Sequence, residues 1–428
     1  MKTDISKLRQ TLSEELHARA FHDFDGAGRF IRFVYLVGNN DSAVIKYINE
    51  YLTAKKLSLI LPSAKFHRIE LGGFALRVER HTEFLTISFV EKGLKVKSGI
   101  SDDAFDQSRL LHLPFEWAQN APAPLFNAIW VEVGGKPPAK LQQSDMLKIL
   151  KSRAVASNNF SDTAAQVHFA FDIDKDGFSR IVVFNRSIEA TRMGRVVQRI
   201  VEVETYRLLA LLGLSTVKEY GGRLASIEEA LNGLTSDLSQ QITKPDGQVQ
   251  PLLSLLSTQA ADVEDIYSQT SYRLSATKAY LGILNGRLER MQMTRLPGFQ
   301  GVRGFLNRRM TPAMDSCAAF SERLSSLSSR INRAGALLRT QTELVIQQQN
   351  RDLLQSMDDR AKHQLRLQQT VESLSIAAVT YYGVGLVGYV AVTLPIDQWG
   401  LSLTSIKAAS VPLIALAIWI TIRKIKDK

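Results

Sequence analysis

Two apolar stretches near the C-terminus constrain this chain more than any other feature. No charged residue stands between Glu372 and Asp397, and residues 376–394 alone would rise about 28 Å as a helix, close to the thickness of the hydrocarbon layer of a bilayer. The second stretch, residues 408–422, would rise only about 22 Å. We therefore expect it to begin several residues earlier, with the Lys407 side chain reaching the interface or facing protein. The sequence thus predicts two transmembrane helices.

Basic residues next to the two stretches predict their orientation. Three precede the first stretch and four follow the second: Arg360, Lys362, Arg366, Arg423, Lys424, Lys426 and Lys428. The connecting loop, residues 396–407, carries only Asp397 and Lys407 as charged groups. Cytoplasmic flanks of membrane helices are enriched in lysine and arginine. We therefore expect a cell inner-membrane protein with two spans and with both termini in the cytoplasm.

The positive charge of the chain is explained by the same membrane interface. The formal net charge is +11, and juxtamembrane lysine and arginine residues bind anionic lipid headgroups. No recognised nucleic-acid-binding motif accompanies this charge, so we expect the lipid bilayer as a partner and no nucleic acid. The N-terminal residues 1–20 are charged throughout and lack the apolar core of a signal peptide. The single cysteine, Cys317, fits a reducing compartment.

Residues 1–185 read as a soluble α+β (mixed α/β) cytosolic domain. Runs typical of strands occur at residues 32–37, 74–79, 83–90, 128–133 and 167–173. Residues 41–55 have the spacing of an amphipathic helix, with an apolar face formed by Ala43, Val44, Tyr47, Ile48 and Tyr51.

Residues 186–300 are predicted to be helical and to contain no strand. A first helix is expected over residues 187–212 and ends at Gly213, because glycine commonly terminates helices. Further helices follow over residues 215–243 and 251–295, separated by the turn-like residues 244–247.

Residues 301–374 are predicted to form a long stalk helix in a helical hairpin or coiled coil. Apolar positions alternate spacings of four and three from Phe320 to Leu338 before Gln341 interrupts them. Transmembrane helices at residues 375–395 and 408–422 follow, and a basic tail, residues 423–428, ends the chain. No proline occurs between Pro312 and Pro395, so one helix can continue from the stalk into the bilayer.

Residues 172–177 (DIDKDG) match the opening of a calcium-binding loop. The twelfth position is Val183, where an EF-hand requires a bidentate glutamate, and both flanks resemble strands. We therefore predict a β-hairpin at this position, while calcium binding by a non-helical loop remains the alternative. No metal site and no cofactor are predicted for the chain.

The glycines of the first membrane stretch match a dinucleotide-binding pattern by spacing alone. Gly383, Gly385 and Gly388 lie in an uncharged segment with no preceding strand, which excludes that interpretation. Small residues in membrane helices allow a second helix to approach closely. These three glycines are therefore predicted to be helix-packing positions.

Two short polar clusters are the candidate functional residues. One contains Glu15, His17 and Arg19, and the other contains His81, Thr82 and Glu83. Imidazole titrates near neutral pH and a neighbouring carboxylate can orient it, so such clusters suit acid–base chemistry or ligand binding. No metal-ligand spacing and no nucleophile motif accompanies them. A role as buried structural polar groups or as helix caps is the interpretation that the sequence favours, and a functional role is the alternative.

Several short segments of the chain form a recognisable set: ELHAR at residues 15–19, HTEF at 81–84, MGRVVQR at 193–199 with ETY at 204–206, and QLRLQQTVE at 364–372 before Tyr381 and Tyr382. Together they resemble one family, the domain of unknown function 3422, a group of uncharacterised bacterial membrane-anchored proteins. The resemblance extends over nearly the whole chain and implies no reaction. The family's usual HARPF is HARAF here, with Ala20 in place of proline.

The order of the parts is also similar to that of CorA-type magnesium channels, although the Gly-Met-Asn signature of those channels is absent. We therefore predict a non-enzymatic scaffold or sensor, whose cytosolic domain is tethered by a stalk, and we expect a homo-oligomer. A homo-oligomeric cation channel or transporter is the first alternative. A metal-dependent or hydrolytic enzyme that uses the His17 and His81 clusters is the second.

Overall fold

The computed structural model describes residues 23–24, 26–62, 64–160, 163–241, 249–394 and 402–426, together with Arg9. The first part of the chain alternates strands with short helices: β1 (Ala27–Leu36), α2 (Ser42–Ala54), β2 (Phe66–Glu70), β3 (Ala75–Arg80), β4 (Phe84–Leu94), the 3₁₀ helix η1 (Gln107–Arg109), α3 (Phe115–Gln119), β5 (Leu125–Gly134), α4 (Gln143–Ile149), β6 (Val155–Phe160), β7 (Ala165–Ala170) and β8 (Phe178–Asn185). Long helices then dominate: α5 (Ala190–Gln241), α6 (Val249–Arg290), the short strand β9 (Thr294–Arg295), α7 (Val302–Val392) and α8 (Leu403–Lys426).

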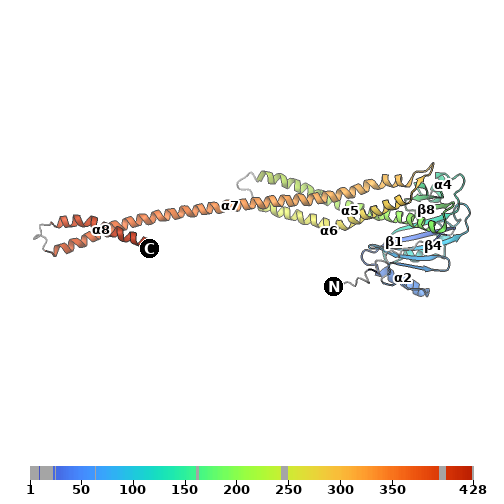
Figure 1. Ribbon diagram of the computed structural model, residues 1–428, viewed down its shortest axis with the longest axis horizontal. Helices are drawn as coiled ribbons and strands as arrows, with labels where there is room; N and C mark the ends of the chain where they lie inside the picture. Colours follow the sequence, from blue (N-terminus) through green and yellow to red (C-terminus); the bar gives the residue numbers. More distant parts are fainter. Residues whose placement is uncertain are drawn as a thin grey trace. The chain divides into compact units, whose positions relative to one another are not determined.

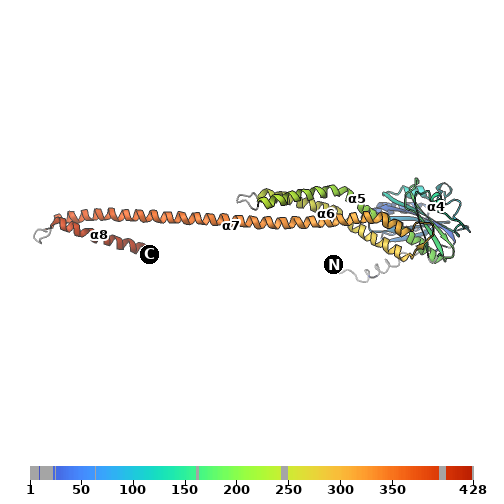
Figure 2. The same cartoon turned by 90° about the horizontal axis from the view of Figure 1, so that it is seen from above.

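The chain divides into two compact units, and each is described by itself. The first contains residues 1–237 and 254–332, and the second contains residues 238–253 and 333–428. Figures 1 and 2 show the sheet together with α5, α6 and the first turns of α7 in the first unit. The predicted mixed α/β N-terminal part, the long helices and the two apolar C-terminal helices are therefore confirmed.

The first unit is built on one sheet, whose nine described strands have the order β2-β3-β4-β1-β5-β8-β7-β6-β9. β5 and β8 are parallel, and the other neighbouring strands whose register is known are antiparallel. Successive side chains of a strand point to opposite faces, and both faces of this sheet are buried. In β1, Phe30 and Val34 belong to one core, whereas Ile31 and Phe33 belong to the other.

Helices cover the two faces differently. The core around Phe30 contains residues of α5, α6 and α7, whereas the core around Ile31 contains residues of α2, α3 and α4. In α2, Val44, Ile45, Ile48 and Leu52 are buried. Val44 and Ile48 were on the predicted apolar face. Burying these faces is the main favourable contribution to the stability of such a domain.

The β7–β8 connection is the hairpin that the sequence predicted at residues 172–177. β7 and β8 pair antiparallel, with Phe169 opposite Ile181. The Asp174 carboxylate accepts hydrogen bonds from the backbone N–H groups of Asp176 and Phe178. Gly177 has a φ of +86°, a conformation that glycine adopts without strain. The same carboxylate pairs with Arg180, so it stabilises the turn.

Two expectations for the helical region were wrong. Gly213 does not end a helix, since α5 continues without a break to Gln241. A Cβ atom at this position would lie 3.0 Å from the Cβ of Thr277 on α6, so the glycine is present because two helices approach closely. Strands also do not stop at residue 186, because β9 adds to β6 at the edge of the sheet. A strand of two residues has too few positions to show a period.

The second unit contains the rest of α7 together with α8. α7 is a single helix from Val302 to Val392, with Pro312 in its early turns. α8 begins at Leu403, in agreement with the expected upstream extension of the second stretch, so residues 403–407 are helical and do not belong to the loop predicted over residues 396–407. Both helices are long and apolar enough to cross a membrane.

Candidate functional site

The structure places one of the two predicted polar clusters. His81 and Thr82 form the turn between β3 and β4, and Glu83 directly precedes β4. Glu15, His17 and Arg19 lie outside the residues that the structure describes. The enzyme alternative requires the His17 and His81 clusters to converge, and the described residues do not test this requirement.

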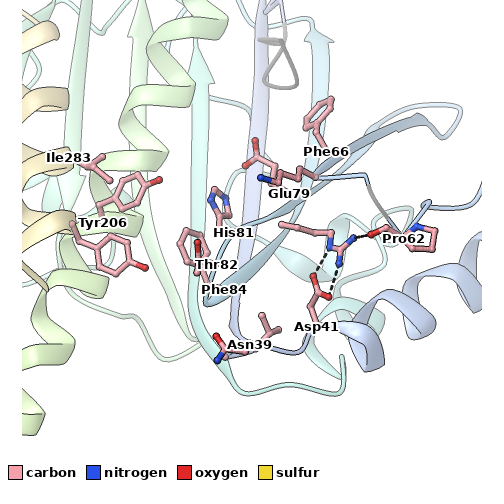
Figure 3. A pocket seen from close by; sticks show the side chains of 15 residues that line it. Asn39, Asp41, Pro62, Phe66, Glu79, His81, Thr82, Phe84, Tyr206 and Ile283 are labelled. Carbon is pink, nitrogen blue, oxygen red and sulfur yellow. Dashed lines mark hydrogen bonds and ion pairs between the residues drawn. The ribbon is translucent and has the colours of Figure 1, made fainter. Parts of the chain in front are cut away.

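A cavity of about 480 Å³ opens beside this turn (Figure 3). Its walls come from the β3–β4 turn, from the segments that follow β1 and precede β2, and from helices α5 and α6. Tyr206 of α5 and Ile283 of α6 lie on the helical side of the cavity, whereas Asn39 and Asp41 lie on the opposite side. We call this cavity the His81 pocket. Its size is typical of sites for small molecules.

Aromatic rings from three elements meet at one wall of the His81 pocket. The His81 imidazole stacks on Phe84, with ring centroids 4.0 Å apart and an interplanar angle of 12°. The Phe84 ring in turn meets Tyr206 and Tyr280 edge to face, at centroid distances of 6.3 and 6.4 Å. The backbone N–H of His81 donates to the carbonyl of Phe84, which closes the turn at 2.9 Å. The imidazole is thus held by its own turn and by helix-borne rings.

Glu83 fastens this turn to α6. Its side chain is 3% exposed, and its carboxylate lies 2.8 Å from the Arg273 guanidinium. A second guanidinium nitrogen of Arg273 donates to Glu83 Oε1 at 3.1 Å, and the Tyr280 hydroxyl donates to the same oxygen. Burial, together with the Glu83 acceptor, raises the pKa of the Tyr280 hydroxyl, so this phenol remains a donor at neutral pH. Glu83 therefore has a structural task, and both of its oxygens are engaged.

A buried charged layer lies in the sheet next to the pocket, and the sequence interpretation missed it. Glu79, which is 5% exposed, accepts a hydrogen bond from Arg32 at 2.8 Å and another from Arg77. Burial alone would raise the pKa of Glu79, but the two guanidinium groups lower it to about 2. The sequence signal for this layer was the presence of charged residues at strand positions whose side chains point into the core. Charged side chains are buried only when they are paired, so several of them together predict buried ion pairs.

Helices α5 and α6 cover this layer with further polar groups. Gln198 donates to Glu202 at 2.9 Å, and the Arg287 guanidinium lies 2.5 Å from the other carboxylate oxygen of Glu202. Gln198 also lies in the segment that carries the family resemblance. An ion pair therefore joins α5 to α6 beside the pocket, in addition to the apolar contacts of the core.

Polar and charged side chains line the His81 pocket and can form hydrogen bonds to a ligand. Its mouth contains Arg80, which is held by Asp41 through contacts of 2.5 and 2.9 Å. Imidazole, phenol, amide and hydroxyl groups face the cavity from His81, Tyr206, Asn39 and Thr82. Within the described ranges, no group of three or more His, Cys, Asp or Glu side chains is arranged to hold a metal ion.

Comparison with known proteins identifies the family. The model of the family described as "Protein of unknown function (DUF3422)" matches residues 5–428. The chain belongs to the DUF3422 family. No match to this DUF3422 protein was found among curated proteins. Among solved structures, one similar chain is the CorA magnesium transporter from Methanocaldococcus jannaschii, at 10% sequence identity and a TM-score of 0.17. That match covers 70% of this chain and 90% of the transporter.

The predicted glycine positions of the DUF3422 protein lie in α7 and differ in their surroundings. A Cβ at Gly383 would lie 3.0 Å from Ile414 of α8, and one at Gly388 would meet the side chain of Lys407. A Cβ at Gly385 would face open space. α8 thus passes close to two of the three positions.

Proposed function

We propose that this DUF3422 protein is a non-enzymatic sensor or scaffold that is anchored in the cell inner membrane by α7 and α8. Its α/β unit would lie in the cytoplasm and bind a small polar ligand in the His81 pocket. The observation that carries the proposal is the shared wall of this pocket, to which the sheet contributes one side and helices α5 and α6 the other. A ligand between two elements can shift their packing if its affinity for the alternative arrangements differs.

The ion pair between Glu83 and Arg273 holds the β3–β4 turn against α6. The β3–β4 turn contacts α6 through Arg273 and Tyr280, so a ligand that moves His81 acts on a turn already fastened to that helix. α6 is followed by β9 and then by α7, which continues to Val392. The chain therefore offers a covalent and helical connection from the pocket to the apolar C-terminal part.

The test is a binding screen on the full-length protein in mild detergent, with thermal unfolding as the readout. We expect at least one polar metabolite to raise the unfolding temperature. The Asn39→Ala and Tyr206→Phe variants should lose that shift, whereas Asn120→Ala, an exposed change outside the pocket, should keep it. Turnover of a substrate that disappears in a folded His81→Ala variant would instead establish an enzyme and refute the proposal.

We also propose an orientation for α7 and α8 in the bilayer, based on the basic residues next to their apolar segments. Arg360, Lys362 and Arg366 precede the apolar part of α7, and Arg423 and Lys424 stand in the last turns of α8. This distribution favours a hairpin with both ends in the cytoplasm. Protease protection of tags at the two termini, in intact and in permeabilised cells, tests the orientation. A tag that is digested from the periplasmic side would contradict it.

We further propose that the protein is a homo-oligomer that pairs through α7. The d positions of one heptad register are Ile346, Leu353, Arg360, Leu367 and Leu374, and the four apolar side chains among them are 51–73% exposed. The corresponding a positions are Asn350, Met357, Gln364 and Val371. Leucine at d with a polar a position favours parallel pairing in a single register. Membrane anchors would hold two identical copies parallel and at equal depth. The a and d positions of α7 in one copy would then lie opposite the same positions in the other.

Disulfide cross-linking in membranes tests this pairing in a Cys317→Ser background. Leu353→Cys lies at a d position and should form a cross-linked dimer on mild oxidation. Gln355→Cys, two residues away on the outer face, is the matched control and should remain monomeric. Equal cross-linking at both positions would indicate random collision and reject the seam.

A further inference from the structure

A second cavity, of about 680 Å³, lies at the start of α7. It is lined by the segment between α4 and β6, by the β7–β8 turn, by α5 and by the first turns of α7. None of the residues that line the His81 pocket lines this one. Every lining residue belongs to the first unit of the chain. We call this cavity the Arg309 pocket.

The floor of the Arg309 pocket is aromatic and apolar. Phe171 stacks on Phe305, with ring centroids 5.1 Å apart, and Leu211 and Met310 extend the apolar surface. The guanidinium carbon of Arg309 lies 4.0 Å above the Phe305 ring. An arginine that lies on an aromatic ring can present its other face to a planar ligand and its N–H edge to an anion.

Cationic groups outnumber carboxylates around this floor. The charged lining side chains are Lys151, Arg153, Lys175, Arg207 and Arg309 against Asp172 and Asp174. Asp174 is paired with Arg180, which does not line the pocket, and Glu204 pairs with Arg207. No ion pair joins Lys151, Arg153, Lys175 or Arg309 to any carboxylate of the described part of the chain. The lining of the pocket thus carries more positive than negative side chains.

Lys151 adds an independent observation, because it has an unfavourable backbone conformation. It follows α4 in a Schellman cap, in which the N–H of Ser152 donates to Leu147 and that of Lys151 to Lys148. Its φ of +48° lies in the left-handed region that favours glycine. A lysine at this position weakens the helix cap relative to glycine, and Lys151 is one of the residues that line the pocket.

We infer that the Arg309 pocket binds a nucleotide, with its phosphates among the lysine and arginine side chains and its base on the Arg309 guanidinium. Phosphate oxygens are strong partners for these cations because charge-assisted hydrogen bonds exceed neutral ones. The cavity volume falls within the range of small-molecule sites. The pocket includes Phe305, Leu306, Arg309 and Met310 of α7, so a bound nucleotide would contact the helix that continues toward the apolar C-terminal part.

The chain provides a matched pair of variants for the test. Lys56 follows α2 in the same Schellman cap, with hydrogen bonds from Leu57 to Leu52 and from Lys56 to Thr53. Its φ is +58°, and it does not line the Arg309 pocket. Lys151→Gly and Lys56→Gly therefore remove the same charge and relieve the same strain, but only the first should affect ligand binding.

Isothermal titration of the full-length protein in detergent with ATP, pyrophosphate and adenosine measures the affinities. We expect ATP to bind more tightly than pyrophosphate, and adenosine to bind weakly or not at all. Lys151→Gly should raise the unfolding temperature and weaken ATP about tenfold, and Arg309→Gln should weaken ATP more than pyrophosphate. Lys56→Gly should raise the unfolding temperature and leave affinity unchanged.

Three results would overturn the inference. They are the absence of ATP and pyrophosphate binding, an unchanged ATP affinity in both Lys151→Gly and Arg309→Gln, and an equal loss of affinity in Lys56→Gly. The last result would show that ATP responds to overall charge. A variant of the His81 pocket, Asn39→Ala, should bind ATP normally, so this test succeeds or fails separately from the function proposed for that pocket.

Discussion

Substitution of Gly213 by alanine tests the close approach of α5 and α6. In an unobstructed helix, alanine is more stable than glycine by about 0.5–1 kcal/mol. At position 213 the added Cβ would lie 3.0 Å from both the Cβ and the Cγ2 of Thr277, and closer still to its hydroxyl oxygen. Overpacking of this kind costs about 1–3 kcal/mol. We therefore expect Gly213→Ala to lower the free energy of unfolding by about 1 kcal/mol.

A second change should restore the stability. Thr277→Ala removes the hydroxyl and the methyl group that the new Cβ would meet, and the buried Thr277 hydroxyl has no hydrogen-bond partner among the described residues. The double variant, Gly213→Ala with Thr277→Ala, should thus lie close to the native protein. The expected coupling between the two positions is about 1–2 kcal/mol, which is typical of residues in contact.

Thermal unfolding of the full-length protein, followed by the helical circular dichroism signal, measures these differences. A change of 1 kcal/mol corresponds to a shift of about 2 °C or slightly more in a unit of this size. Gly222→Ala is the control on the same helix, because a Cβ there would meet no atom within 4 Å, and it should stabilise the protein. If Gly213→Ala were as stabilising as Gly222→Ala, the close-packing explanation would be refuted.

Three further predictions concern buried charged and titratable groups. Glu83→Gln should destabilise the fold by about 1–2 kcal/mol. This is less than the loss of a fully buried ion pair, because Arg273 is 25% exposed. A double-mutant cycle with Arg273→Met should show coupling between the two positions, and additive effects would contradict the ion pair. Burial raises the pKa of Glu132 from 4.5 to about 7 against the opposing charge of Arg29. The folded state therefore favours the protonated carboxyl, and the free energy of unfolding should fall by at most about 3 kcal/mol as pH rises from about 4.5 to 7. Urea titrations of Glu132→Gln should lack this pH dependence, and an unchanged dependence would exclude Glu132 as its source. Burial lowers the pKa of His168 from 6.5 to about 3. The stability that the protein gains from a neutral His168 is therefore fully present above pH 6.5 and is lost as pH falls toward 3. Nitrogen NMR should find a neutral ring at pH 5, and a protonated ring there would contradict the burial argument.

Features with a local signal were predictable from the sequence. The amphipathic spacing of residues 41–55 predicted α2, because the spacing of the apolar residues determines which face of a helix is buried. Strand-like runs predicted half of β1 and most of β3, β4, β5 and β7, and the uncharged length of residues 373–396 predicted the apolar end of α7. Each of these signals depends on residues within one element.

Features that depend on distant contacts were not predictable. Gly213 has the local signature of a helix end, and only the position of Thr277 on another helix explains its place within α5. In the same way, His81 and Glu83 gave a candidate cluster, but Arg273 and Tyr280, which hold Glu83, come from α6. No local pattern connects positions that are about 190 residues apart.

The two-residue strand β9 has a consequence for biosynthesis. The side-chain amide of Asn158 donates to the carbonyl of Thr294, and its oxygen accepts from the N–H of Val302. Before residues 294–302 leave the ribosome, β6 is therefore an edge strand with unpaired backbone groups, and edges of this kind promote aggregation. Completion of the sheet must wait until α5 and α6 have been synthesised. A fragment that ends after β8 would contain eight strands of the sheet and still expose this edge, so the edge is covered only when the chain extends to Val302, the first residue of α7.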